Sequence, residues 1–121
     1  MTTKAEPRAG GPSTYTMTIP SNQIFSNGVQ VPKGSAPVLI VFPSGWDPAV
    51  LLTIQVSLDG NTWIDVMNND GSPVSSVVHP GTSLLLQNQE VWAPWLRLRS
   101  GTREAPVPQS ADRAFTLWTN P

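Results

Sequence analysis

Prolines are spread along the whole chain and restrict what it can fold into. The sequence holds 13 prolines in 121 residues. A proline inside a helix removes a backbone hydrogen bond and clashes with the preceding turn. No segment of helical length carries the i, i+3, i+4, i+7 apolar spacing of an amphipathic helix. The chain is therefore predicted to consist of short strands joined by turns.

From Ser13 onward, short apolar runs alternate with turn residues at a spacing of about ten residues, which is typical of an antiparallel sandwich or barrel. About eight strands are predicted, the number found in a jelly roll. They span residues 13–19, 36–42, 51–58, 62–67, 73–78, 83–87, 95–100 and 114–119. A further short strand fits either 23–26 or 28–31. We expect an all-β, antiparallel, jelly-roll-like β-sandwich that forms one domain over residues 14–121.

Residues 1–13 form a polar segment that is rich in proline and glycine and has no periodicity. Nothing in it repays the cost of ordering the backbone, about 1–2 kcal/mol per residue. We expect an extended N-terminal arm that is flexible in the free protein and lies across a neighbouring subunit in an assembly. Lys4 and Arg8 are its candidate contact residues.

Charge and cysteine content exclude several classes of protein. The net charge is −1, which disfavours nucleic-acid binding by bulk electrostatics. There are no cysteines and no apolar run long enough for a signal peptide or a membrane span. We therefore expect no nucleic-acid or membrane partner, and synthesis in a reducing cytoplasm.

Charged residues are scarce: they make up 12% of the chain, against about 25% in an average soluble domain. A solitary monomer normally stays dispersed through a densely charged surface. The chain also holds five tryptophans, a residue enriched in the cores of interfaces. These features favour a subunit that works through contacts with other subunits, although a weakly charged monomer remains an alternative.

Two predicted strands show which of their faces are buried. In 51–58 the apolar residues alternate with polar ones, so one face should lie on the core and the other in water. The core-facing set is Leu52, Ile54, Val56 and Leu58, and the water-facing set is Thr53, Gln55, Ser57 and Asp59. The strand 36–42 is apolar on both faces, so its second face must also be covered.

The two C-terminal strands carry aromatic residues on their outer faces. In 95–100, Leu96 and Leu98 should point inward, while the opposite face carries Trp95, Arg97 and Arg99. In 114–119, the core pair should be Phe115 and Leu117, with Trp118 on the other face.

Four of the seven basic residues lie in the last quarter of the chain: Arg97, Arg99, Arg103 and Arg113. Either they form a solvated face balanced by Glu104 and Asp112, or Arg97 and Arg99 are part of a docking surface that pairs carboxylates and stacks on rings.

The stretch VSLDGNTWIDV places Asp59 and Asp65 around a tryptophan, which raises the possibility of a carboxylate pair. Asp59-Gly60 lies between two strand-like runs and is predicted to be a hairpin turn. A second turn at 69–73 would complete a three-stranded meander. A calcium loop at NNDG fits poorly, because the positions that should be acidic are Val66 and Val77.

No recognisable motif supports catalysis. His79 is the single histidine and precedes Pro80 at a predicted strand end. With no cysteine beside it, His79 cannot complete a zinc site, and no nucleophile motif or phosphate-binding loop accompanies it. We expect no enzymatic activity, no cofactor, no metal and no catalytic residues.

Two family resemblances follow from these motifs. IQVSLDGNTWIDV, followed by WLRLRSG, resembles a local pattern of discoidin-type jelly rolls, in which a strand, a D-G turn and a Trp-bearing strand precede an aromatic-x-Arg strand. The chain lacks the paired cysteines of that family. This resemblance implies a jelly-roll fold.

The segment from LLTIQVSLDGNTWIDVMNNDG through WLRLRSGTREAPVPQSADRAFTLW is similar to small virion structural proteins of tailed bacteriophages. This resemblance implies a non-enzymatic capsid decoration (cement) protein. Such a protein sits on the outer capsid surface of the virion as a homotrimer, binds the major capsid protein, and is made in the host bacterial cytoplasm. The candidate interface residues in the folded part are Trp46, Trp92, Trp95, Arg97 and Arg99.

The alternative is a carbohydrate-binding module of a phage tail fibre or tail tip. In that case exposed Trp46, Trp92 or Trp95 would stack on sugar rings, and Asp or Asn side chains of the turns would bind hydroxyl groups.

Overall fold

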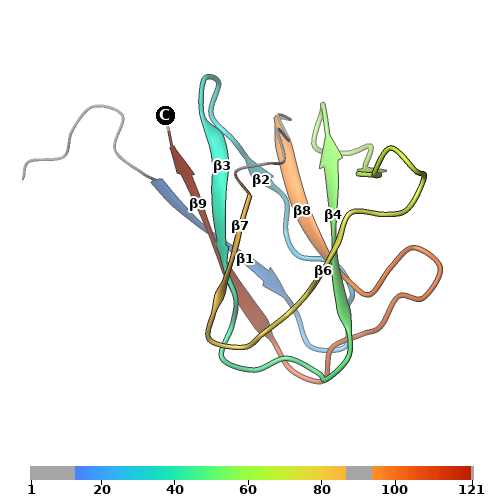
Figure 1. Cartoon of the computed structure of the whole chain (residues 1–121). Helices are drawn as coiled ribbons and strands as arrows, with labels where there is room; N and C mark the ends of the chain where they lie inside the picture. Colours follow the sequence, from blue (N-terminus) through green and yellow to red (C-terminus); the bar gives the residue numbers. More distant parts are fainter. Residues whose placement is uncertain (1–12, 87–93, 121) are drawn as a thin grey trace, which may run out of the picture.

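The computed structural model describes residues 13–86 and 94–120, and these form two antiparallel sheets packed as a sandwich (Figure 1). The first sheet has the order β1-β9-β3-β7, with bounds Ser13–Ile19, Arg113–Asn120, Ala36–Val41 and Ser83–Leu85. The second has the order β2-β8-β4-β5, with β6 also paired to β4. Its strands span Val29–Gln30, Trp95–Ser100, Leu51–Ser57, Ile64–Asp65 and Ser75–Val77. The predicted all-β sandwich is confirmed, and β2 falls in the second of the two ranges left open for a short strand.

The chain passes repeatedly from one sheet to the other, which makes the sandwich jelly-roll-like. The strands β1, β3, β7 and β9 lie in the first sheet, and those between them lie in the second. The first and last strands pair in continuous register from Ser13↔Thr119 to Ile19↔Arg113. Ser13, at the boundary of the predicted arm, is thus part of β1. Residues 1–12, with Lys4 and Arg8, lie outside the described residues. No helix in the described part of the chain is long and apolar enough to cross a membrane.

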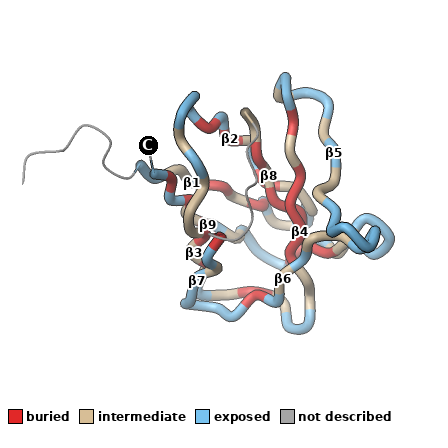
Figure 2. The backbone as a smooth tube through the Cα atoms, turned by 45° about the horizontal axis from the view of Figure 1, so that its top comes forward, coloured by how far each residue is buried: buried red, intermediate tan, exposed pale blue. Residues whose placement is uncertain are grey.

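The core lies between the sheets, where the inward-facing residues of the long strands are buried (Figure 2). Phe115 is completely buried, and its ring meets Phe42 and Trp46 edge-to-face, with centroids 6.1 and 5.5 Å apart. Edge-to-face contacts of this kind add stability beyond the burial of area. The inward positions predicted for the two C-terminal strands are confirmed, since all four are buried: Leu96, Leu98, Phe115 and Leu117.

The predicted meander forms only in part: an isolated antiparallel bridge joins Met67 to Pro73 across the second turn, but β6 pairs with β4 and not with β5. β5 covers one half of β4 through Gln55↔Asp65 and Val56↔Ile64. The chain then turns back through the Asn69–Pro73 segment, and β6 covers the other half from Leu51↔Val77 to Thr53↔Ser75. Two short strands thus share one long neighbour, since neither is long enough to cover it alone.

The polar face of β4 was predicted to be solvated, but it is buried. Thr53, Gln55 and Ser57 are 1%, 7% and 2% exposed. Leu58, placed on the core side by its alternation, is 82% exposed because β4 ends at Ser57 and Leu58 already belongs to the turn. A polar row can be buried only where its hydrogen bonds are satisfied, so another layer of side chains must lie over this sheet.

Candidate functional site

The turn after β4 is held by its own side chains. Asp59 Oδ1 accepts the backbone N–H groups of Asn61 and Thr62, both at 2.8 Å. Gly60 has φ +83°, which glycine adopts without strain. The hydrogen bonds from Thr62 and Asn61 lower the pKa of Asp59. The predicted hairpin turn is confirmed.

The two carboxylates around Trp63 do not form a pair. Asp59 binds its own turn, whereas Asp65 accepts a hydrogen bond from Gln55 Nε2 at 2.8 Å and pairs with Arg99 Nη1 at 3.0 Å. Asp70 likewise bonds within its turn, to the N–H of Ser72 at 2.9 Å. Among residues 13–86 and 94–120, no group of three or more His, Cys, Asp or Glu side chains could hold a metal ion.

A polar network covers the outer face of the second sheet. Strand register places Thr53 opposite Arg99 and Gln55 opposite Arg97. Arg99 Nε donates to Thr53 Oγ1 at 3.0 Å, and Arg97 Nε donates to Gln55 Oε1 at 2.8 Å. Gln55 thereby links Arg97 to Asp65. These bonds satisfy the buried polar face of β4.

Aromatic rings hold the outermost arginine. The guanidinium carbon of Arg97 lies 3.8 Å from the ring centroid of Phe25 and 4.4 Å from that of Trp63. Contacts of this kind contribute about 0.5–2 kcal/mol each. Phe25 reaches this place because it forms an isolated bridge with Arg99. Trp63 precedes β5 and lies two residues from Asp65, so both face the same side of the sheet.

Two glycines allow the tryptophans to lie against the backbone. A Cβ on Gly28 would come within 2.9 Å of the Trp63 ring and 3.5 Å of the Trp95 ring. A Cβ on Gly60 would come within 2.9 Å of the Trp95 ring. The indoles therefore converge on Gly28. We call the surface formed by Phe25, Trp63, Trp95 and Arg97 the aromatic–arginine face.

The layer of buried side chains beneath the aromatic–arginine face contains a second arginine, Arg99. Arg99 is 4% exposed, and its Nη2 is buried without a hydrogen-bond partner among the residues that the structure describes. Burial and the neighbouring charge of Arg99 lower the pKa of Arg97. For Asp65, burial alone would raise the pKa, but the Gln55 hydrogen bond and the charge of Arg99 outweigh it, so the pKa lies below its ordinary value. The carboxylate of Asp65 therefore pairs directly with Arg99 and is linked to Arg97 through Gln55.

The structure brings together three of the predicted interface residues, Trp95, Arg97 and Arg99. Arg99 was expected to be open to a partner, which is wrong, since its side chain is buried in the Asp65 ion pair. Trp63 and Phe25 were missed. The alternation of TWIDV gave a signal for Trp63. Phe25 lies in the range 23–26 that was left open for a short strand, and it bridges to Arg99, but nothing in that range indicated that its ring would meet Arg97. Trp92 lies outside the described residues.

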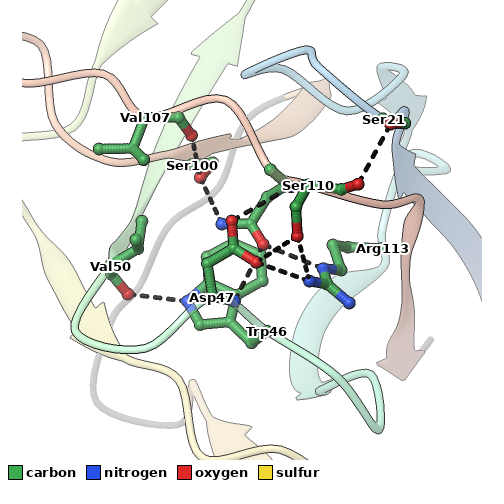
Figure 3. A network of polar contacts seen from close by, with 9 residues as sticks. Ser21, Trp46, Asp47, Val50, Ser100, Val107, Ser110 and Arg113 are labelled. Carbon is green, nitrogen blue, oxygen red and sulfur yellow. Dashed lines mark hydrogen bonds and ion pairs between the residues drawn. The ribbon is translucent and has the colours of Figure 1, made fainter.

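Trp46 was expected to be exposed, which is also wrong. It is buried in the core, and its Nε1 donates to the carbonyl of Val50 at 2.8 Å. The next residue, Asp47, accepts Arg113 Nη2 at 2.7 Å and Ser110 Oγ at 2.8 Å (Figure 3). Arg113 and Arg99 thus pair with Asp47 and Asp65, not with Glu104 and Asp112 as the sequence suggested.

The same network closes one end of the sandwich. Gln109 is completely buried and uses both ends of its amide. It donates to Ser100 Oγ at 2.9 Å and accepts the Asp47 N–H at 3.1 Å and Arg113 Nε at 3.0 Å. The network joins the loop after β3 to the segment before β9. Its polar groups bind one another, so its role is structural.

Acid should destabilise the protein through its carboxylates. The pKa values of Asp47, Asp59, Asp65 and Asp70 all lie below the ordinary 3.8. A lowered native pKa contributes stability above the unfolded pKa that is lost as pH falls through the native pKa. Urea midpoints should therefore hold between pH 7 and 5 and fall below about pH 4.

The Asp47→Asn variant should show less of this acid-dependent loss, since its side chain cannot be protonated. Urea midpoints of the wild-type protein that stay unchanged down to pH 2.5 would contradict the prediction.

Comparisons with known proteins identify no relative: no family model, no curated protein and no solved structure matches the chain.

Proposed function

We propose that this chain is a non-enzymatic structural protein of a tailed-phage particle, and specifically a capsid decoration protein that binds the outer capsid surface as a homotrimer. The phage origin is proposed on the resemblance of the central and C-terminal sequence segments alone. One structural observation supports the role in assembly: two neighbouring rows of described residues on the outer face of the first sheet carry no charge.

Strand register defines this surface, which we call the neutral face. Thr14 lies opposite Trp118, Trp118 opposite Leu39, and Leu39 opposite Leu85, so one row crosses all four strands. The neighbouring row crosses the same strands through Thr16, Thr116, Val41 and Ser83. Every residue of both rows is uncharged.

A neutral, partly apolar sheet face suits self-association. Trp118 is 43% exposed and Leu85 is 51% exposed, and both would be covered by a second copy of the chain. Sheets that face water normally carry charges that prevent such contact. In a trimer, one part of the neutral face of each copy packs on a different part of the next copy's neutral face, without like-charge repulsion and without burying an unpaired ion. The proposed occupant of this face is therefore another copy of the same chain, which also covers the second apolar side of β3.

Attachment to the shell then gains from multivalency. A trimer that holds several modest contacts with the major capsid protein binds far more tightly than one copy, because each later contact forms within the same complex. The expected location is the capsid surface of the virion.

A charge placed on the neutral face should break the oligomer. We expect the full chain to elute as a trimer in light-scattering chromatography at micromolar concentration. Trp118→Glu and Leu85→Lys should each shift it to a monomer, because association would then bury an unpaired charge.

Leu58→Lys is the matched control. It adds a charge at an apolar residue that is 82% exposed, more than Trp118 or Leu85, and that lies in the turn after β4 rather than on the neutral face. It should leave the trimer intact. A wild-type chain that stays monomeric at high concentration and does not bind capsids would refute the proposed function.

The tail-module alternative has one observation in its favour, the partly exposed indoles of Trp63 and Trp95 on the aromatic–arginine face. Copy number in purified particles distinguishes the two locations. Quantitative mass spectrometry should find on the order of hundreds of copies per particle for a decoration protein that repeats over the shell. A handful of copies would place the chain in the tail.

A further inference from the structure

Arg97 offers hydrogen-bond donors that the described residues do not use. Its Nε donates to Gln55, and aromatic rings lie over its guanidinium. No described residue accepts a hydrogen bond from either Nη atom of Arg97. Each atom keeps some contact with solvent, because Arg99 Nη2 is the one fully buried side-chain nitrogen or oxygen without a partner in the described part of the chain. The two Nη groups of this partly buried side chain therefore form a charged fork that remains open to a ligand at the surface.

This fork lies in a region with too little negative charge. Asp65 is the carboxylate that Arg99 and, through Gln55, Arg97 both depend on. The buried, unpaired Nη2 of Arg99 adds positive potential under the face. A carboxylate ligand would relieve this imbalance, and a guanidinium edge matches a carboxylate with two parallel hydrogen bonds.

The remainder of the face suits a pyranose ring. Trp63 and Trp95 are partly exposed and are held rigidly against Gly28 and Gly60. A flat indole packs well against the C–H face of a sugar. Neither indole N–H bonds to another described residue, so both are available as donors to hydroxyl groups. The adjoining turn adds Asn61 and Thr62, whose side chains are exposed, neutral and polar.

From these observations we propose that the aromatic–arginine face binds an acidic saccharide, a pyranose that carries a carboxylate. Arg97 binds the carboxylate, Trp95 and Trp63 contact the ring, and the turn at Asn61 and Thr62 binds hydroxyl groups. The carboxylate belongs to a uronic acid or to a sialic acid. The site lies on the second sheet, apart from the neutral face, so it stands independently of self-association.

An acidic peptide fits this surface less well. Peptides add to sheets mainly by pairing with a free edge, whereas these side chains lie on the face of the sheet, across β8 and the β4–β5 hairpin. The rigid rings, the partly exposed guanidinium and the polar side chains of Asn61 and Thr62 match a ligand with one carboxylate and several hydroxyl groups. The carboxylate of Asp59 in the same turn is engaged by the backbone N–H groups of Asn61 and Thr62.

The test is a titration of the full-length protein with matched ligands, followed by isothermal calorimetry or by two-dimensional NMR. The ligands are 3′-sialyllactose, tetragalacturonate, lactose and a short poly-glutamate peptide. Binding of 3′-sialyllactose or tetragalacturonate, at least tenfold tighter than that of lactose and of the peptide, is the expected result. Whichever acidic sugar binds more tightly identifies the source of the carboxylate.

Variants separate the site from general electrostatics. Arg97→Met keeps an unbranched apolar stem between the rings but removes the fork, and it should weaken binding at least tenfold. Trp95→Leu should do the same. Arg103→Gln is the control: it removes one exposed positive charge that acts on Asp65 but belongs neither to the fork nor to the rings, and it should change affinity less than threefold. Arg97→Lys should recover little, because a point charge does not replace the fork.

Three results would overturn the proposal. These are equal binding of lactose and sialyllactose, tighter binding of the peptide than of either acidic sugar, and no binding of any ligand. Unchanged affinity in a folded Arg97→Met protein would do so as well. If Arg97→Met does not fold, Gly28→Ala replaces it as the test variant. Its added Cβ would lie 2.9 Å from the Trp63 ring, which must then shift and disturb the face. Light-scattering chromatography of each variant should still show the trimer, so failure here is distinct from failure of the proposed self-association.

Discussion

Replacing Gly101 with alanine should destabilise the fold by about 2–5 kcal/mol, the largest effect expected from the addition of one methyl group. Gly101 has φ +89°, a conformation that costs an L-residue about 1–2 kcal/mol. A Cβ there would also overlap the carbonyl oxygen of Ala105 and lie 2.7 Å from the Val107 nitrogen. These are backbone atoms, which cannot turn aside as a side chain can.

The surroundings of Gly101 oppose any shift that would make room. Its N–H donates to the carbonyl of Leu51 at 2.6 Å, and its own carbonyl accepts Thr53 Oγ1 at 2.8 Å. It also bridges to Pro106. Movement of Gly101 would therefore loosen the end of β8 and its pairing with β4.

Gly34→Ala is the control for the backbone conformation alone. Gly34 has φ +87°, and a Cβ there would meet nothing within 4 Å. It should lose only about 1–2 kcal/mol. Urea unfolding of both variants measures the difference, which isolates the steric contribution. If both variants lost the same free energy of unfolding, the loop after β8 would accommodate the added methyl group without cost, and the prediction would be wrong.

Removing the carboxylate of Asp65 should cost about 2–4 kcal/mol at neutral pH. The Asp65→Ala variant leaves Arg99, with a side chain 5% exposed, charged and without its partner. It also leaves Gln55 Nε2 without its acceptor. A buried group that loses its partner carries the full cost of its desolvation, so the loss exceeds that of a surface ion pair, about 0–1 kcal/mol.

Asp47→Ala is the matched comparison, because the Asp47–Arg113 pair is more open, at 25% and 14% exposure of the two side chains. Its loss should be the smaller of the two. The double variant Asp65→Leu with Arg99→Met should recover much of the stability that Asp65→Ala loses, because it also removes the buried, unpaired charge of Arg99. A double variant that is less stable than Asp65→Ala would show that the ion pair itself, not the unpaired charge, determines the loss.

The same ion pair supports the proposed saccharide site. Asp65 holds Gln55, and Gln55 holds the Nε of Arg97. In Asp65→Ala, Arg97 should therefore become less ordered, and affinity for an acidic sugar should fall even though Asp65 does not touch the ligand. Stability and binding are linked here because the arginine that faces outward is positioned by the layer beneath it.

Local pattern in the sequence was sufficient for the strands and for the turn. Prolines excluded helices, the alternation of apolar residues placed Leu96, Leu98, Phe115 and Leu117 in the core, and Asp59-Gly60 defined a hairpin. Each of these depends on backbone preferences or on side-chain period within a few residues. Such interactions act within one segment, so the sequence alone determines them.

Tertiary structure decided what covers each face of the sheets. Thr53 and Gln55 of β4 alternate with apolar residues as in a solvated strand, yet they are buried, because Arg97, Arg99 and Asp65 from other strands satisfy their hydrogen bonds. Trp46, Phe25 and Trp63 likewise acquire their places through residues distant in the chain. Periodicity distinguishes the two sides of a strand but does not say which neighbour lies against each side. That depends on how the strands cross between the sheets, and only the folded chain establishes it.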